Sequence, residues 1–254
     1  MDLIDTHCHL DAPPLGDDPT GVLRRARAAG VTAVVVPGTT LETSRLALAL
    51  ARTHDAVWAA VGIHPDADEE LDSDAFEALL ADDRVIALGE IGLDGSQGRA
   101  RLDRQELRCR RQLALAARHG VPVLIHSRDA TGRMLRMLQE LGPGGPGGIL
   151  HAYAGSLEVA AKLAALGFCF GVGGVVTRPH ARRVRAVIAA LPLEQLVLET
   201  DAPYIGTAAR PKGKVEPADL PEIAAALAEL RDQPVEVVAA VTGATARRVL
   251  RLPR

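Results

Sequence analysis

The sequence has few cysteines, few aromatic residues and no long hydrophobic run. Its three cysteines, Cys8, Cys109 and Cys169, lie far apart and form no C-x-x-C pair. This pattern argues against a disulfide framework or a thiolate zinc site and predicts small buried thiols in a reducing compartment. Aromatic residues make up 2% of the chain, too few for a broad base-stacking platform. No apolar run approaches the roughly 18 residues that a membrane span needs.

The charge balance also excludes classes of protein. The 254 residues carry 29 Lys and Arg against 32 Asp and Glu, a formal net charge of −3. The chain therefore lacks the basic footprint of proteins that hold nucleic acid mainly by surface charge. The first residues show neither the basic stretch nor the apolar segment of a secretory signal. We expect a cytoplasmic protein with no membrane partner, and the sequence indicates no obligate protein partner.

Short apolar runs alternate with amphipathic segments along the chain. The runs are continuously hydrophobic and rich in Val, Ile and Leu, which is typical of strands covered on both faces. They are Leu3–His7, Thr32–Gly38, Val57–His64, Val85–Gly92, Val121–Ser127, Gly148–Tyr153, Phe168–Val176 and Leu196–Pro203. The amphipathic segments include Leu41–His54, Leu102–His119, Ser156–Leu166, Ala181–Leu191, Leu220–Arg231 and Val235–Leu250. In the first of these, Leu46, Ala49 and Leu50 fall on one apolar stripe.

Eight alternations of strand and helix predict an α/β fold, a (β/α)8 TIM barrel with an additional C-terminal helix. We expect one domain that spans residues 1–254. A doubly wound open sheet is the competing architecture, but it usually carries a Gly-rich turn after its first strand. Gly171-Val172-Gly173-Gly174 lacks the dinucleotide-binding spacing and indicates a close backbone approach or a bulge instead. The Gly- and Pro-rich stretch 142–148 is expected to be a connector.

Histidines and carboxylates stand where the predicted strands end. These residues are His7, His9, His64, Glu90, His126, His151 and Asp201. The C-terminal ends of barrel strands converge on one site, and side chains two apart on a strand share a face. Imidazole and carboxylate ligands without thiolate suit Zn²⁺, Mn²⁺ or Fe²⁺. Leaving His64 aside, the remaining six exceed what one tetrahedral ion needs, so two ions joined by a carboxylate would fit.

Six motifs, in order along essentially the whole chain, resemble those of the TatD family of metal-dependent deoxyribonucleases. They are Ile4-Asp5-Thr6-His7-Cys8-His9-Leu10, Val61-Gly62-Ile63-His64-Pro65, Gly89-Glu90-Ile91-Gly92-Leu93-Asp94, Pro122-Val123-Leu124-Ile125-His126-Ser127-Arg128-Asp129-Ala130, His151-Ala152-Tyr153-Ala154-Gly155-Ser156 and Glu199-Thr200-Asp201-Ala202-Pro203-Tyr204. The chain departs from the family pattern at several positions, Gly95, Cys109 and Val215 among them, and none of these is a candidate ligand.

The resemblance implies two divalent metal ions per subunit, Zn²⁺, Mn²⁺ or Mg²⁺. The implied ligands are His7, His9 and Asp201 for one ion, His126 and His151 for the other, and Glu90 as the bridge. Asp201 is also implied to be the general base that takes a proton from the attacking water. The implied activity is hydrolysis of DNA phosphodiester bonds, as a 3′-5′ exonuclease on single-stranded or frayed ends.

Two pocket positions, His64 and Tyr204, are implied by the resemblance to contact substrate. Each has an alternative, since His64 could simply end its strand in a turn and Tyr204 could be a buried hydroxyl. Arg128 follows a candidate ligand by two residues and could hold a phosphate, or pair with Asp129 or another carboxylate. Lys212 and Lys214 belong to a positive run after the eighth strand, a candidate contact for backbone phosphates.

Two other functions fit parts of the pattern. An amidohydrolase-type enzyme could use the same ligands on a small molecule or on a D-aminoacyl-tRNA ester. Its variant with a carboxylated lysine bridge is excluded, because none of the three lysines, Lys162, Lys212 and Lys214, lies on a predicted strand. A barrel with purely structural ions would need neither an open coordination position nor a general base.

Overall fold

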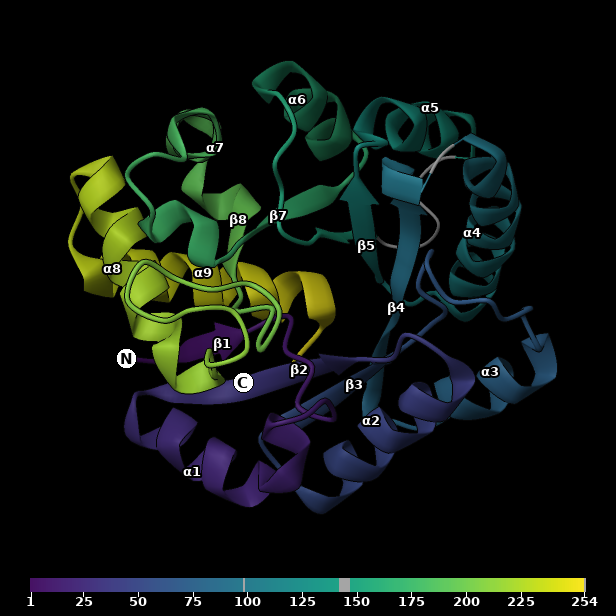
Figure 1. Ribbon diagram of the computed structural model, residues 1–254, viewed down its shortest axis with the longest axis horizontal. Coiled ribbons are helices and arrows are strands. Elements are labelled where there is room, and N and C mark those ends of the chain that lie inside the picture. The colour runs from purple at the N-terminus through teal and green to yellow at the C-terminus, as the bar shows by residue number, and fades with distance from the viewer. Residues whose placement is uncertain (98, 142–146, 254) are drawn as a thin grey trace.

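The computed structural model describes residues 1–97, 99–141 and 147–253. Eight parallel strands form one sheet whose spatial order follows the sequence, and helices surround it (Figure 1). The strands are β1 (Leu3–Asp5), β2 (Val31–Pro37), β3 (Val57–Val61), β4 (Val85–Asp94), β5 (Val123–Arg128), β6 (Gly148–Leu150), β7 (Phe168–Val172) and β8 (Leu196–Leu198). The amides of Thr6 and His9 donate to the carbonyls of Leu198 and Ala202, at 3.0 and 2.8 Å, and join β1 to β8. The predicted (β/α)8 barrel is confirmed.

The helices begin where the sequence supplies capping residues. They are α1 (Pro19–Ala28), α2 (Leu41–Thr53), α3 (Ser73–Leu80), α4 (Arg99–His119), α5 (Thr131–Leu141), α6 (Leu157–Ala165), α7 (Arg182–Ala190), α8 (Leu220–Arg231) and α9 (Val235–Leu250). Thr40 forms a capping box at α2, and the side chains of Asp18, Asp72 and Ser156 accept from backbone amides at α1, α3 and α6. None of these described helices combines the length and apolarity of a membrane span. The predicted connector at 142–148 lies mostly outside the described residues.

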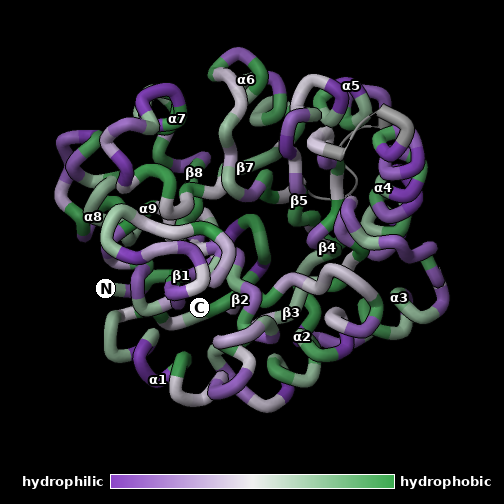
Figure 2. Tube along the Cα trace, in the orientation of Figure 1, coloured by the Kyte–Doolittle hydropathy of each residue, from purple (hydrophilic) through white to green (hydrophobic). Residues whose placement is uncertain are grey.

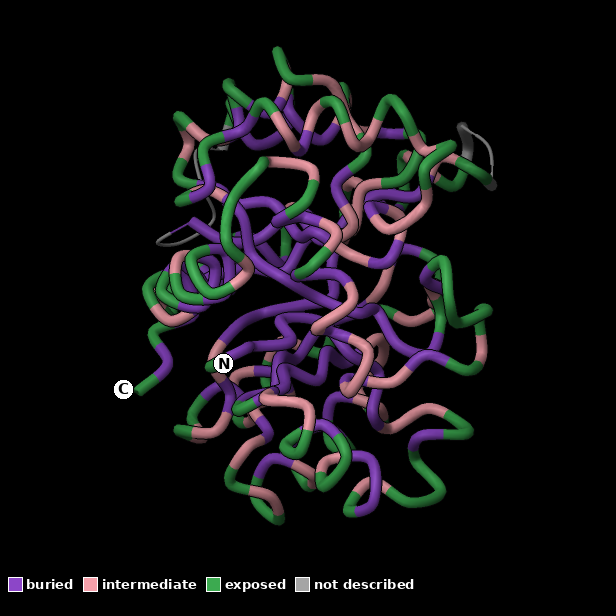
Figure 3. Tube along the Cα trace, turned by 90° about the vertical axis from the view of Figure 1, so that its left-hand side faces the viewer, coloured by how far each residue is buried: buried purple, intermediate pink, exposed green. Residues whose placement is uncertain are grey.

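The buried residues form two apolar layers, one inside the barrel and one between strands and helices. Figure 2 shows hydrophobic strands in the middle of the molecule, and Figure 3 shows the buried segments there. The inner layer contains small or branched side chains such as Val35, Ala60 and Leu124, and Leu250 of α9 packs against it. Thr245 donates to the carbonyl of Glu194, which precedes β8. The predicted C-terminal helix therefore closes the barrel at the N-terminal ends of its strands.

The three cysteines are buried, as predicted. Cys8 and Cys109 belong to the layer between strands and helices, and Cys169 belongs to the inner layer. Burial raises the pKa of Cys109 to about 12, so its thiol stays protonated at neutral pH. These residues act as small hydrophobic side chains.

The apolar stripe predicted for α2 is wrong. Leu46 is 48% exposed, and the residues that α2 buries include Ser44, Ala47 and Leu48. Ser44 is buried because its hydroxyl accepts a hydrogen bond from the amide of Gly62, just after β3, at 3.1 Å. A hydrogen bond to the backbone removes the cost of burying a polar group, so hydropathy alone misplaced this face by one position.

Candidate active site

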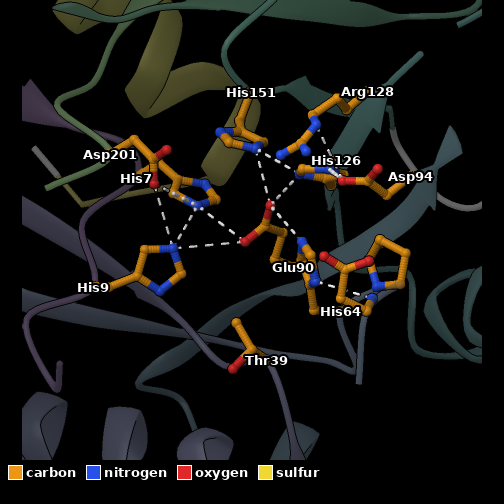
Figure 4. Close-up of polar contacts among 12 residues, drawn as sticks. His7, His9, Thr39, His64, Glu90, Asp94, His126, Arg128, His151 and Asp201 are labelled. Atoms are coloured by element: carbon orange, nitrogen blue, oxygen red, sulfur yellow. Dashed lines mark hydrogen bonds and ion pairs between the residues drawn. The ribbon is translucent and has the colours of Figure 1, made fainter. Parts of the chain in front are cut away.

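The candidate ligands converge at the end of the barrel where the strands terminate (Figure 4). Glu90 and His126 lie within β4 and β5, and His7, His9, His151 and Asp201 follow β1, β6 and β8. Six of the eight strands end earlier than predicted, β8 at Leu198 rather than at Pro203, whereas β4 and β5 continue to Asp94 and Arg128. Ala152 and Asp201 have φ values of 45° and 49°, in the left-handed region and outside the extended conformation of a strand. After β6 and β8 the chain therefore leaves the sheet beside the site residues His151 and Asp201, whereas Glu90 and His126 are held by the strands themselves.

Glu90 is 3% exposed and stands at the centre of the site. Its Oε1 lies 2.9 Å from Nδ1 of His126 and 2.9 Å from Nε2 of His151. Its Oε2 faces the other way, 3.3 Å from Nε2 of His7 and 3.6 Å from Nε2 of His9. The two oxygens of one carboxylate thus face two separate pairs of imidazoles.

Burial and neighbouring charge oppose each other in this cluster. Burial alone would raise the pKa of Glu90, but the imidazoles of His151 and His7 and a hydrogen bond with His126 hold it well below its usual range. Burial would lower the pKa of His151, but the carboxylates of Glu90 and Glu199 raise it well above its usual value. The site therefore keeps its carboxylate ionised and attracts positive charge.

The arrangement of donor atoms fits a divalent cation. His7, His9 and Asp201 have ligand atoms within 4.8 Å of one another, and so do His7, Glu90 and His151. Nε2 of His7 and Nε2 of His9 are only 3.3 Å apart, and Oδ1 of Asp201 lies 3.4 Å from Nε2 of His9. Buried nitrogen and oxygen atoms without thiolate suit Zn²⁺ or Mn²⁺, and a carboxylate between two imidazole pairs suits a bridging role.

His64 belongs to a third cluster, with Glu90 and His126, although the sequence pattern indicated only a pocket position for it. Its Nδ1 accepts a hydrogen bond from the amide of Asp66 at 3.1 Å, so the neutral ring carries its proton on Nε2. Nε2 faces Oε1 of Glu90 at 3.7 Å. Burial, opposed by Glu90, lowers the pKa of His64 to about 4, so the ring is neutral at pH 7. A protonated Nε2 suits donation to an oxygen better than metal ligation.

Three buried carboxylates that the sequence pattern left without a role hold the ligands in place. Oδ2 of Asp94 lies 3.0 Å from Nε2 of His126, and Oε1 of Glu199 lies 3.7 Å from Nδ1 of His151. Asp5 accepts hydrogen bonds from the amide and hydroxyl of Thr200, the residue before Asp201. Asp94 accepts a hydrogen bond from the ring of His126 and so orients it and sets its tautomer, whereas Glu199 contributes negative charge beside His151. Each lies within four residues of a predicted ligand and in the same motif, which is the signal that the sequence offers.

Glycine makes one of these contacts possible. A Cβ atom at Gly171 would lie 2.2 Å from Oε2 of Glu199, so only glycine lets this carboxylate approach β7. The predicted close backbone approach in this stretch is found at Gly174, where a Cβ atom would lie 2.5 Å from the carbonyl oxygen of Gly206.

Replacing Asp94 with Asn should lower metal affinity or turnover by about 10–100-fold, the usual scale for such an outer carboxylate. The amide removes the charge that faces Nε2 of His126 and leaves the size of the side chain unchanged. Metal titration followed calorimetrically measures the effect. The control is Asp129→Asn, because Asp129 lines the same pocket on the neighbouring segment but is exposed. Equal behaviour of the two variants would contradict the role given to Asp94.

A cavity of about 1040 Å³ opens above the cluster. His64, Arg128, Tyr204 and Lys212 line it, whereas Lys214 is exposed and does not. Nε of Arg128 lies 3.6 Å from Oδ2 of Asp94. Arg128 therefore pairs with Asp94 rather than with Asp129, and its side chain remains 61% exposed. Tyr204 is 47% exposed, which excludes the alternative of a buried hydroxyl.

A barrel of this topology with a buried carboxylate among imidazoles at the C-terminal strand ends defines the class of metal-dependent hydrolases. The profile of the family described as TatD related DNase matches residues 4–251. The chain belongs to this family. The prediction of a TatD-family hydrolase that acts on ester bonds is confirmed at that level.

Individual relatives agree with this assignment. The chain is 38% identical over 244 residues to the "Uncharacterized metal-dependent hydrolase YjjV" of Escherichia coli (strain K12), covering 93% of each chain. It is 35% identical over 255 residues to the "3'-5' ssDNA/RNA exonuclease TatD" of Cronobacter sakazakii, covering 97% of each. The crystal structure of YJJV, a TatD homologue from Escherichia coli K12, superposes with a TM-score of 0.93 at 35% identity, covering 99% of this chain and 98% of that one.

Proposed function

We propose that the protein is a metal-dependent deoxyribonuclease that removes nucleotides from the 3′ ends of single-stranded or frayed DNA. The central observation is that the two oxygens of Glu90 face separate imidazole pairs beneath a cavity lined by cationic side chains. Relatives about 35% identical are named 3′-5′ ssDNA/RNA exonucleases, which supports this substrate class and polarity. The buried, free cysteines suit a reducing compartment, and we place the enzyme in the cytoplasm.

We further propose that the site holds two divalent ions, Zn²⁺, Mn²⁺ or Mg²⁺. The ligands would be His7, His9 and Asp201 for one ion, His126 and His151 for the other, and Glu90 for both. When bound, the ions would lower the pKa of the attacking water and neutralise charge on the phosphate oxygens.

The chain's own groups then handle the proton and the substrate. Asp201 is the general base, because imidazoles, His9 foremost, overcome burial and keep its pKa low, so that it is ionised and can accept the proton of the attacking water. His64 directs its Nε2–H at a phosphate oxygen. Arg128 and Lys212 contact backbone phosphates, and the exposed ring of Tyr204 stacks against a base.

Hydrolysis of an end-labelled single-stranded oligonucleotide tests this function. Chelated enzyme is compared with enzyme resupplied separately with Mg²⁺, Mn²⁺ or Zn²⁺, and Glu90→Ala controls for contaminating nucleases. We expect a ladder that shortens from the 3′ end, requires metal and is absent for the variant. If a protein that binds two ions cleaves no DNA with any metal, the assignment passes to a hydrolase of small molecules or D-aminoacyl-tRNA esters.

A further inference from the structure

The charged residues of the cavity lining are unevenly distributed. The cationic side chains of the lining, Arg128 of β5, Arg183 of α7 and Lys212 after β8, come from the half of the barrel that runs from β5 to β8, and Asp129 next to Arg128 is the exposed carboxylate among them. Small residues of the segment between β6 and α6 line the cavity as well, among them Ala154 and Gly155. The segment between β3 and α3 lies on the other side, with Asp66 in the lining and more acidic residues beyond it.

Arg183 is the arginine of α7 that reaches the cavity. Its side chain is exposed, and within the described residues it forms no hydrogen bond or ion pair. Two neighbouring arginines of α7 are not available in this way. Arg185 donates a hydrogen bond to the carbonyl of Val176, and Arg182 is exposed but does not line the cavity. A guanidinium with five free donors at a cavity wall is suited to a phosphate group.

The acidic side is held in a fixed position. Arg108 of α4 donates to the carbonyls of His64, Pro65, Ala67 and Glu69, at 2.8 to 2.9 Å. These hydrogen bonds fix the backbone of the segment and keep the exposed carboxylate of Asp66 in the cavity lining, with Asp68 beyond it. A polyanion that enters the site would be repelled from this side and attracted to the other.

We propose that the substrate strand leaves the catalytic cluster over the segment between β6 and α6, and that a phosphate internal to the scissile one binds Arg183. This proposal rests on the proposed nuclease function. The volume of about 1040 Å³ slightly exceeds the roughly 300–1,000 Å³ of pockets for drug-sized ligands, which leaves room for more than one nucleotide. Arg128 lies nearer the cluster, beside Asp94, so Arg183 serves the more distant phosphate.

The test compares Arg183→Gln with the matched control Arg182→Gln, each as metal-loaded enzyme. Fluorescence anisotropy in an Asp201→Asn background gives the Kd of a single-stranded hexanucleotide and of a dinucleotide at several salt concentrations. We expect Arg183→Gln to weaken hexanucleotide binding about tenfold, as for loss of one charged hydrogen-bonding group. The slope of log K against log salt should fall by about 0.7, the value for one phosphate contact on a single strand. Arg182→Gln should change neither quantity.

Two further comparisons test the path of the substrate strand: the length of the oligonucleotide, and a variant in the acidic segment between β3 and α3. The preference for the hexanucleotide over the dinucleotide should fall in Arg183→Gln, whereas an equal loss for both would place Arg183 on the scissile phosphate and overturn the proposal. Asp66→Asn, in the cavity lining, should change the Kd less than threefold, and a tenfold gain would show that the strand crosses the acidic segment. If wild-type enzyme neither cleaves nor binds single-stranded DNA, the proposed function itself is wrong. If it does both and the two arginine variants behave alike, only the path is wrong.

Discussion

Replacing Glu90 with Gln should reduce oligonucleotide hydrolysis by about 10²–10³-fold or more, the scale for losing one preorganised electrostatic contact in an active site. The wild-type carboxylate presents one anionic oxygen to His126 and His151 and the other to His7 and His9. A glutamine side chain has no charge, and its NH2 group donates rather than accepts, so it cannot serve both sides. The rate and the metal content of purified protein, measured by mass spectrometry, report the two consequences together.

Glu229→Gln is the control for this variant. Glu229 is an exposed residue of α8, away from the cavity lining, so the same change of atoms should leave rate and metal content unchanged. Circular dichroism should show that both proteins are folded. A Glu90→Gln protein that kept two ions and a rate within tenfold of wild type would contradict the bridging role.

Replacing Asp201 with Asn should lower kcat by about 10²–10⁴-fold, the usual contribution of a general base. Asparagine can adopt the left-handed backbone conformation of Asp201, at φ 49°, so the turn should survive. The side chain would keep one oxygen near His9 but lose the charge that accepts a proton. Single-turnover rates at saturating metal separate this loss from weaker ion binding.

The matched control is Asp232→Asn at the end of α8. Asp232 has nearly the same backbone conformation, φ 51°, and lies outside the cavity lining. It should keep the wild-type rate. A near-normal kcat in Asp201→Asn with metal bound would mean that another group takes the proton.

The hydrophobic pattern of the sequence predicts the barrel and its strand order, because continuous apolar runs such as Val85–Gly92 suit strands buried on both faces. The same pattern does not predict where the strands end. The run Leu196–Pro203 has the hydropathy of one strand, yet β8 ends at Leu198. Hydropathy does not register a change of φ at a single residue.

The sequence predicts the candidate metal ligands of the site but not the carboxylates that contact them. Histidines at the ends of several strands are an unusual pattern that predicts a common site, and these histidines lie together in the structure (Figure 4). The sequence does not predict the contacts of Asp94 and Glu199 with His126 and His151, because such a carboxylate has no characteristic spacing from its histidine and the contact depends on how two strands pack. His64 is a similar case, since the amide of Asp66 determines which ring nitrogen carries the proton.

The backbone contacts between β1 and β8 have a consequence for folding. The amide of Asp201 donates to the carbonyl of His7 at 2.8 Å, and Asp5 accepts from Thr200, so groups separated by about 195 positions in sequence meet there. Contacts of such high sequence separation require a large loss of chain entropy and form slowly. The site of His7, His9 and Asp201 exists only once the first and last strands have paired. Ions that bind there would shift the equilibrium toward the native barrel, because an unfolded or half-assembled chain has no such site.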